Sequence, residues 1–427
     1  MGTPVGGGAA YGDRMTRLLA AVLALVIIPG AACSAASEPE SAPGQSAQEP
    51  TAAQTSSTPD EQVSTSTPPS EGTNASAGQA APRLRVKRVA TGLDHPWDVQ
   101  PIGHGRLLVT ERSGRLAIIE DGDVRRLRVP TDLIWASGET GLMGLAIDPG
   151  FRTNGRFYTC TGGNPQGNPD VRILVWKLNA AATRATYKRV LISGFPASSG
   201  RHGGCRLLIL DNGALLVGTG DAAVGSNPQD KTSLGGKTLM LDRVTGAPWP
   251  SNPFINAANT RQRFLHTYGH RNVQGIAQRD DGTLWSAEHG PDVDDEVNLL
   301  RRGGNYGWNP VPGYNESVPM TDQSLPGPQI EAKWSSGSPT LATSGASFVS
   351  GKEWGWYAGT LAVAGLKASR VVFMKFDGKG KFLGSRTPSA LKAYGRLRAV
   401  TSLPNGGLLI TTDNGGNDAV LRVRPSA

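Results

Sequence analysis

Six copies of one short pattern recur between Arg83 and the end of the chain. Each copy has an apolar segment, a turn that contains glycine, and a second segment of alternating large apolar residues that ends in Thr or a small residue. The turn glycines are Gly105, Gly155, Gly213, Gly282, Gly359 and Gly407, separated by 48 to 77 residues. Units of this length are typical of propeller blades whose loops vary in length. The sequence therefore predicts an all-β fold, a six-bladed β-propeller.

The spacing of these glycines also predicts where the loops are longest and how the ring closes. The two widest intervals follow Gly213 and Gly282, which favours the longest insertions near the fourth and fifth blades. Convincing amphipathic helices are scarce, and 56 Gly with 30 Pro suit turn-rich β structure. We expect the segment 84–89 to pair with 420–423, because joining the two ends of the chain removes exposed sheet edges.

The N-terminal residues 1–33 have the features of an export signal. Met15, Thr16 and Arg17 precede an apolar run from Leu18 to Ile28, which is the usual order of a secretory signal, so we expect translation to start at Met15. This run is too short to favour a permanent membrane-spanning helix. Small residues then precede Cys33, as in a bacterial lipobox, so Cys33 is the expected site of lipidation. The alternative is an ordinary signal peptide with an incidental cysteine.

Residues 34–82 have a composition that does not support a packed core. They are rich in Ser, Thr, Ala, Pro, Glu and Gln, and contain neither an aromatic residue nor a Lys or Arg. Such a segment cannot bury enough apolar surface to offset the entropy lost on ordering, so we predict a disordered tether. The propeller domain is then expected to occupy residues 83–427.

Charge is distributed unevenly between these regions. The whole chain has a net charge of +8, and because the tether contains only acidic charges, the folded part is more basic still. A basic domain can indicate nucleic-acid binding, but an exported protein rarely meets nucleic acid, and the sequence has no Lys/Arg run with interleaved aromatic residues. We therefore expect no nucleic-acid partner, and attribute the charge to an anionic cofactor and to anionic envelope surfaces.

Polar residues are most densely gathered between His266 and Asn309. Arg271 and Asn272 follow a glycine there, and a guanidinium suits carboxylate or carbonyl oxygens. A second candidate lies earlier, at His202, which two glycines follow and which precedes Asp221. Histidine titrates close to neutral pH and suits the removal of a hydroxyl proton. We interpret the two glycines as allowing a planar ligand to approach the backbone. A buried structural histidine and a solvated loop arginine are the alternative interpretations.

Four linked motifs carry a family resemblance. They are Tyr268-Gly-His-Arg-Asn-Val-Gln-Gly275, Glu288-His-Gly-Pro291, Asp295-Glu-Val-Asn298 and Gly304-Asn-Tyr-Gly-Trp308. In this order they resemble the soluble pyrroloquinoline quinone (PQQ)-dependent glucose/sorbosone dehydrogenases, also called aldose sugar dehydrogenases. The resemblance implies a PQQ- and Ca²⁺-dependent enzyme that oxidises an aldose at the anomeric carbon to a lactone and passes a hydride to the quinone. The physiological electron acceptor stays unknown.

The resemblance also implies roles for individual residues. His202 would be the general base, Asp221 would orient its imidazole or else cap a turn, and Arg271 with Asn272 would lie over the quinone. The backbone carbonyls of Gly290 and Pro291 would bind Ca²⁺. The three carboxylates of PQQ would be held by further cations, namely Lys367, Arg396 and Arg398. The two arginines lie two residues apart and would face the same side of a strand.

Several positions stay open. Glu139 stands where relatives often have a glutamine, so its contact with substrate is an expectation only. The acids Asp292, Asp294, Asp295 and Glu296 either bind a second, structural ion or cap a loop. Cys160 and Cys205 either pair, which export would permit, or remain free. Tryptophans such as Trp308 are interpreted as blade packing.

Two other function classes are compatible with a propeller. A propeller-type lactonase would need a central cage of Asp, Asn and Glu, which the sequence does not suggest. A non-catalytic propeller that binds the cell envelope would be favoured by loss of His202 or Arg271, and both are present. We therefore expect an enzyme on the outer face of the cell membrane, held there by a lipid anchor, with an aldose as its small-molecule substrate.

Overall fold

A computed structural model describes Gly2 and residues 80–426, and contains six four-stranded sheets. The expectations for Met15, Cys33 and the tether lie outside the described residues, apart from the tether's last three positions. The first three sheets are β2 (Pro96–Gly103), β3 (Arg106–Glu111), β4 (Arg115–Glu120) and β5 (Asp123–Leu127); β6 (Leu142–Ile147), β7 (Arg156–Gly163), β8 (Asp170–Leu178) and β9 (Ala185–Pro196); and β10 (Arg206–Ile209), β11 (Ala214–Gly218), β12 (Lys237–Asp242) and β13 (Leu265–Tyr268). The prediction of six antiparallel blades is confirmed.

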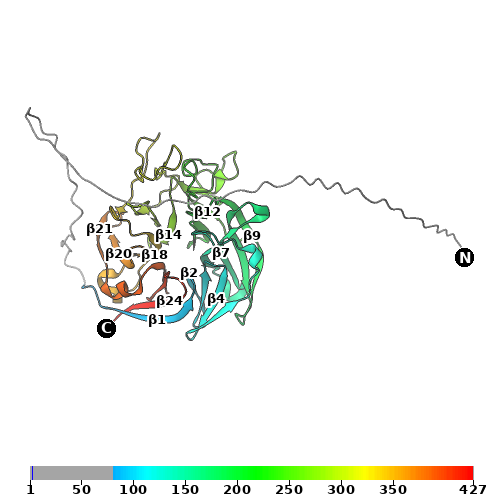
Figure 1. Ribbon diagram of the computed structural model, residues 1–427, viewed down its shortest axis with the longest axis vertical. Coiled ribbons are helices and arrows are strands. Elements are labelled where there is room, and N and C mark those ends of the chain that lie inside the picture. The colour runs from blue at the N-terminus through cyan, green and yellow to red at the C-terminus, as the bar shows by residue number, and fades with distance from the viewer. Residues whose placement is uncertain (1, 3–79, 427) are drawn as a thin grey trace, which may run out of the picture. The chain divides into compact units, whose positions relative to one another are not determined.

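The last three sheets complete the ring. They are β14 (Val273–Gln278), β15 (Leu284–Glu288), β16 (Glu296–Leu299) and β17 (Trp334–Ser335); β18 (Thr343–Phe348), β19 (Leu361–Gly365), β20 (Arg370–Phe376) and β21 (Phe382–Arg386); and β22 (Leu397–Ser402), β23 (Leu408–Thr412) and β24 (Asp418–Pro425) with β1 (Leu84–Leu93). The first strands of neighbouring blades contact one another around the whole ring, so β2, β6, β10, β14, β18 and β22 lie innermost. Figure 1 shows the sheets arranged around this common centre.

Helical structure among the described residues is limited to short turns. They are α1 (Phe151–Asn154) and the 3₁₀ turns η1 (Thr131–Leu133), η2 (Pro165–Gly167), η3 (Gln262–Phe264), η4 (Lys352–Tyr357) and η5 (Ser389–Tyr394). Within residues 80–426, none of these is long and apolar enough to cross a bilayer. The recurring glycines lie in the turns between the first and second strands of the blades, where Gly213 and Gly282, for example, have φ of 86° and 82°. Glycine adopts this left-handed conformation without a steric penalty.

The predicted ring closure is confirmed. β1 pairs antiparallel with β24, with Leu84 opposite Pro425 and Val86 opposite Val423, and the two strands run side by side in Figure 1. The sixth blade is therefore built from both ends of the described chain. Its core includes Trp354 and Phe373 from the fifth blade packed beside Leu421, so blade-to-blade contacts and strand pairing both close the ring.

The predicted position of the long insertions is partly wrong. The longest connection, residues 300–333 between β16 and β17, belongs to the fourth blade, but the next two, 219–236 and 243–264, belong to the third. The reason is that each recurring glycine lies in the first turn of its blade. A long connection later in that blade widens the interval to the next glycine, so the wide intervals mark the third and fourth blades.

Lys237 fixes one of these connections. Its side chain is fully buried, and its ammonium donates hydrogen bonds to the carbonyl oxygens of Asn227, Pro228 and Gly235 at 2.6, 3.0 and 2.7 Å. The connection 219–236 therefore folds around one lysine head group. Asn227 in turn donates to the carbonyl oxygen of Asp221 at 2.9 Å, which links this fold to a candidate site residue.

Cys160 and Cys205 are paired. Their sulfur atoms are joined in a disulfide with a Cα–Cα distance of 6.0 Å. Cys160 lies on β7 and Cys205 directly precedes β10, so the bond connects the second and third blades. Of the two alternatives that the sequence left open, the structure has the paired one.

Candidate active site

Strand direction gathers the candidate residues at one end of the ring. Innermost strands begin at this end, which we call the site face, and the antiparallel second strands end there. Glu139, His202, Arg271, Asn272 and Arg396 precede innermost strands, whereas Asp221, Gly290, Pro291 and Lys367 follow second strands. Residues from five blades therefore lie at one end of the ring.

His202 and Asp221 form a buried pair at this face. Nδ1 of His202 lies 2.8 Å from Oδ1 of Asp221, and their side chains are 3% and 0% exposed. A carboxylate only accepts hydrogen bonds, so Nδ1 carries the proton and Nε2 presents its lone pair. This is the arrangement that a general base requires, and Asp221 occupies the orienting position that the sequence suggested.

Two side chains that sequence reasoning did not assign to the site complete this pair. The Tyr314 hydroxyl donates to Oδ2 of Asp221 at 2.8 Å, and the Trp308 indole donates to the same oxygen at 2.8 Å. Trp308 was predicted to serve blade packing, whereas it also holds the carboxylate. Trp308 lies in the motif Asn305-Tyr-Gly-Trp308, which made it recognisable in the sequence. Tyr314 lies in an irregular stretch that contains no recognisable motif.

The backbone around His202 is unusually constrained. His202 has φ of 48°, a left-handed conformation that is uncommon for a residue with a side chain. A Cβ at Gly203 would lie 2.3 Å from Thr140 Oγ1, and one at Gly204 would lie 2.7 Å from the backbone nitrogen of Gly220. These contacts show that the two glycines are required for tight packing between neighbouring loops, and their role as a ligand surface stays a prediction.

Glu139 and Asn272 link the base to the next blade. One carboxylate oxygen of Glu139 accepts from the His202 backbone N–H and from the Asn272 side-chain amide, each at 3.2 Å. The Asn272 amide oxygen accepts from the backbone of Gly204 at 3.2 Å. Both residues thus hold the loop that carries His202, whatever else they contact.

Arg271 is buried beside the base and has several partners. Its guanidinium donates to the His289 carbonyl oxygen at 2.8 Å and to a carboxylate oxygen of Glu316. Its Nε is buried and has no hydrogen-bond partner among the described residues. Burial, and after it the Arg271 charge, lowers the pKa of His289 to about 3, so His289 adds no positive charge here at neutral pH.

The three further cations differ in their surroundings. Arg398 is buried and donates to Asp413 at 2.7 and 3.0 Å and to Gln274 at 3.2 Å. Arg396 precedes β22, is 47% exposed and lies 3.9 Å from the same acid, while Lys367 is exposed. The two arginines therefore share Asp413, but only Arg396 and Lys367 are open to solvent.

Asp413 also belongs to a group of side chains whose spacing could suit a metal ion. His95, Asp413 and Asp418 are the group of His, Cys, Asp and Glu within residues 80–426 whose spacing could hold a metal ion. Asp413 is already paired with Arg398, and Nδ1 of His95 lies 2.7 Å from its other oxygen. Asp413 thus serves as a counter-charge to the arginines, and the cluster does not resemble the acidic cage of a lactonase.

The loop after β15 carries Gly290 and Pro291. Neither of their carbonyl oxygens accepts a hydrogen bond from the described part of the chain. Asp295 caps this loop, because it accepts from the Gly290 backbone at 2.9 Å, and Asp294 accepts from Ser335 at 2.8 Å. For these two acids the loop-capping alternative describes the contacts. Burial, and then the nearby Glu288, raises the pKa of Glu296 well above its usual range.

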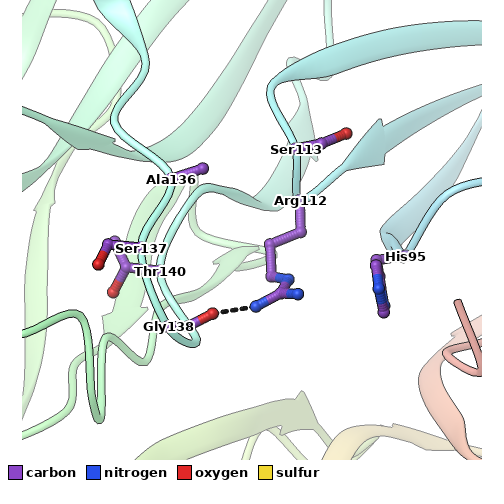
Figure 2. A pocket seen from close by; sticks show the side chains of 7 residues that line it. All are labelled: His95, Arg112, Ser113, Ala136, Ser137, Gly138 and Thr140. Atoms are coloured by element: carbon purple, nitrogen blue, oxygen red, sulfur yellow. Dashed lines mark hydrogen bonds between the residues drawn. The ribbon is translucent and has the colours of Figure 1, made fainter.

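A cavity of about 250 Å³ lies on the same face between the first and second blades (Figure 2). It is lined by His95, Arg112, Ser113, Ala136, Ser137, Gly138 and Thr140. The Arg112 side chain reaches across it and donates to the Gly138 carbonyl oxygen, as the dashed line in Figure 2 marks. The cavity adjoins Asp413 through His95 but does not include His202 or Arg271.

Known proteins are similar to this chain in sequence and architecture. An uncharacterised Synechocystis protein is 30% identical over 80% of this chain and 87% of its own, and an aldose sugar dehydrogenase of Escherichia coli is 29% identical over 82% and 95%. The PQQ-bound aldose sugar dehydrogenase of Streptomyces coelicolor superposes with a TM-score of 0.68 at 27% identity, covering 81% of this chain and 99% of that one. The family model described as glucose/sorbosone dehydrogenase matches residues 93–422. The chain belongs to the glucose/sorbosone dehydrogenase family.

Proposed function

We propose that this protein oxidises an aldose sugar at the anomeric carbon, with PQQ and Ca²⁺ as cofactors. The observation that carries the proposal is the buried His202–Asp221 pair, with Nε2 of His202 left as acceptor, on the same face as Arg271 and the open cations. A relative solved with PQQ bound supports the choice of cofactor, and a relative named quinoprotein glucose dehydrogenase B supports a sugar as substrate.

The residues present fit PQQ. Its three carboxylates need several cations, and Lys367 and Arg396 are exposed on loops that end at the site face. Arg398 is buried and shares Asp413 with Arg396, and the Nε of Arg271 is a buried donor without an acceptor among residues 80–426. Guanidinium groups bind carboxylates strongly because two N–H donors match two oxygens. We assign Lys367, Arg396, Arg398, Arg271 and Asn272 to cofactor binding.

The loop after β15 fits Ca²⁺. The carbonyl oxygens of Gly290 and Pro291 accept no hydrogen bond within residues 80–426, and backbone carbonyls are common Ca²⁺ ligands. When bound, PQQ supplies a two-electron acceptor that Ca²⁺ polarises, so that a sugar which loses a hydride and a proton leaves as a lactone.

The chain's own residues would manage the proton and the charge. Nε2 of His202 accepts the proton of the anomeric hydroxyl, while Asp221 stabilises the imidazolium through Nδ1. The Arg271 guanidinium holds positive charge where negative charge develops. Glu139 accepts a hydrogen bond from the His202 backbone N–H, which puts it next to the proposed base, and we propose it as a substrate contact.

The proposal is tested by reconstitution. Purified protein is incubated with PQQ and Ca²⁺, and dye reduction is followed across a panel of aldoses, with one sample lacking each cofactor. We expect turnover only when both are present, and a lactone as the product in chromatography. Absence of turnover with every sugar, in protein that demonstrably binds PQQ, would contradict the assignment.

Lys367 provides a sharper test of cofactor binding, because it is exposed and is paired with no carboxylate within residues 80–426, so its removal leaves no such carboxylate without a partner. Replacing Lys367 with Gln should weaken PQQ binding about 10- to 150-fold, the loss of one charge-assisted contact of about 1.5–3 kcal/mol. Affinity is measured by titrating cofactor-free protein. Lys379→Gln is the matched control, since Lys379 is exposed in the turn at the other end of the same blade. Equal affinity of the two variants would reject the assignment.

We further propose that the protein is exported and lipid-anchored through Cys33, as the residues before it suggest. Cys33→Ala should move the protein from the membrane fraction to the soluble extracytoplasmic fraction, because two or more acyl chains are what retain a lipoprotein. Cell fractionation and immunoblotting measure this. Unchanged membrane retention of the variant would contradict lipidation.

A further inference from the structure

The fourth-blade insertion, residues 300–333, reaches back over the third blade at the site face. A Cβ on Gly225 would lie 2.0 Å from the Gly313 carbonyl oxygen, so the insertion and the connection 219–236 are in direct backbone contact. Asn315 donates from its backbone to the Pro310 carbonyl oxygen at 2.9 Å, which closes a tight turn. This turn presents Tyr314 and Glu316 to the candidate catalytic residues.

Tyr314 contacts both His202 and Asp221. Its hydroxyl donates to Oδ2 of Asp221 at 2.8 Å, and the Tyr314 hydroxyl oxygen also lies 2.9 Å from Nδ1 of His202. The Tyr314 and His202 rings are 5.8 Å apart. Burial, and then the charge of Asp221, raises the pKa of Tyr314, so the hydroxyl keeps its proton at working pH and remains a donor.

Glu316 fixes the turn from its other side. Its carboxylate accepts from Arg271 and from Arg201, the latter at 3.1 Å to both oxygens. Burial opposes ionisation of Glu316, but the hydrogen bonds and charges of Arg271 and Arg201 together outweigh it and lower the pKa of that carboxyl. The turn is thus anchored by an ionised group to a buried guanidinium, which limits how far Tyr314 can move.

We propose that Tyr314 is a positioning residue for the His202–Asp221 pair, held in place by Glu316. The hydroxyl shares the carboxylate with the imidazole, so it sets both the orientation of Asp221 and the charge that His202 experiences. The inference rests on the proposed role of His202 as base. It assigns a function to an insertion that the blade pattern of the fold does not require.

Several groups face His202, and a test of the role of Tyr314 must separate its effect from theirs. They are Asp221 and Tyr314 at Nδ1, Arg201 with its guanidinium 3.4 Å from Nε2, Glu139 at the backbone N–H, and the nearby His289. Only Tyr314 among these can be altered by deleting one hydroxyl while its ring is kept. Tyr314→Phe is therefore the variant of choice.

The first measurement needs no cofactor. The chain has six histidines, so ¹⁵N-histidine NMR of the cofactor-free protein can follow His202 alone, with His202→Asn used to assign its signals. In Tyr314→Phe, Asp221 loses one donor and attracts the imidazolium more strongly, so we expect the His202 titration midpoint to rise by about half a pH unit or more. No change, or a lower midpoint, would overturn the proposal.

The second measurement uses the reconstituted enzyme. Losing one hydrogen bond of about 0.5–1.5 kcal/mol should lower kcat about 2- to 13-fold and move the pH midpoint of kcat/KM upward, with KM for the sugar within about twofold. Glu316→Gln, which loosens the turn, should also raise the titration midpoint of His202, by a smaller amount. A Glu316→Gln midpoint equal to that of the wild type would show that Tyr314 is not held by Glu316.

Two matched controls keep the test specific. Tyr187→Phe removes a hydroxyl from β9 in the second blade, and Glu331→Gln neutralises an exposed acid elsewhere in the same insertion. Both should leave the NMR midpoint and the kinetics unchanged. If the NMR shift appears but no sugar is turned over, the proposed reaction fails while the positioning role stands. If turnover is normal and the shift is absent, the positioning role fails alone.

Discussion

Replacing His202 with asparagine is expected to lower turnover by about 10²–10⁴-fold, the usual contribution of a general base. Asparagine is the informative substitution because it tolerates the left-handed backbone at this position, where φ is 48°. PQQ and Ca²⁺ should still bind, since neither assigned set of ligands includes His202. Single-turnover reduction of the bound quinone by sugar, measured by absorbance, separates the chemical step from binding.

A matched control is available at His104, which is exposed in the turn between β2 and β3 and also has a positive φ, 52°. His104→Asn should match the wild type in rate and stability. The pH dependence of kcat/KM should be the same as that of the wild type in the control and should lose the contribution of the base in His202→Asn. A His202→Asn enzyme that oxidises sugar at near the wild-type rate would mean that another group takes the proton, with Glu139 the first to examine.

Replacing Lys237 with methionine is expected to lower the free energy of unfolding by about 3–5 kcal/mol, because three buried carbonyl oxygens lose their donor and the apolar side chain cannot replace it. Urea unfolding followed by tryptophan fluorescence measures the loss. Lys177→Met, an exposed site on β8, should change stability by less than about 0.5 kcal/mol. Equal stability of the two variants would mean that the carbonyl cage around Lys237 contributes little.

The same residue predicts a pH dependence. Burial lowers the pKa of Lys237 to about 7, against about 10.4 in an unfolded chain. Between these values the unfolded chain binds more protons than the folded one, so this group makes stability rise with pH. The methionine variant lacks the group. The stability gap between wild type and variant should therefore widen from about pH 6 to about pH 9, and a gap that narrows would contradict the assignment.

The fold was predictable because its signal is local and repeated. Each blade begins with a hairpin whose turn glycine and alternating apolar residues lie within a few positions of one another, as at Gly213 between β10 and β11. Ring closure by β1 and β24 was predictable for a different reason, since a propeller without it would leave an open edge. The long insertions were predicted one blade too late, because the recurring glycines mark the first turn of each blade and do not show which later connection of that blade is long.

The candidate site was predictable only where it borders a strand. His202, Asp221 and Arg271 flank strands that the pattern locates, so the topology brings them together. Tyr314 and Glu316 have no such marker, because the insertion that carries them has no periodicity and is shaped by contacts with Asp221 and Arg271. The pairing of Arg398 with Asp413 likewise depends on two strands of the last blade, and no local pattern indicates it.

The closure of the sixth blade determines which end of the ring is suited to attachment to a surface. β24 starts at the site face with Asp418 and ends at Pro425, where Leu84 of β1 lies opposite. Leu84 and Pro425 therefore both lie at the end of the ring away from the site face. An electrode or resin coupled close to Leu84 or Pro425 would therefore leave the site face pointing into the solution, so attachment at these two positions would not obstruct access of a dissolved substrate.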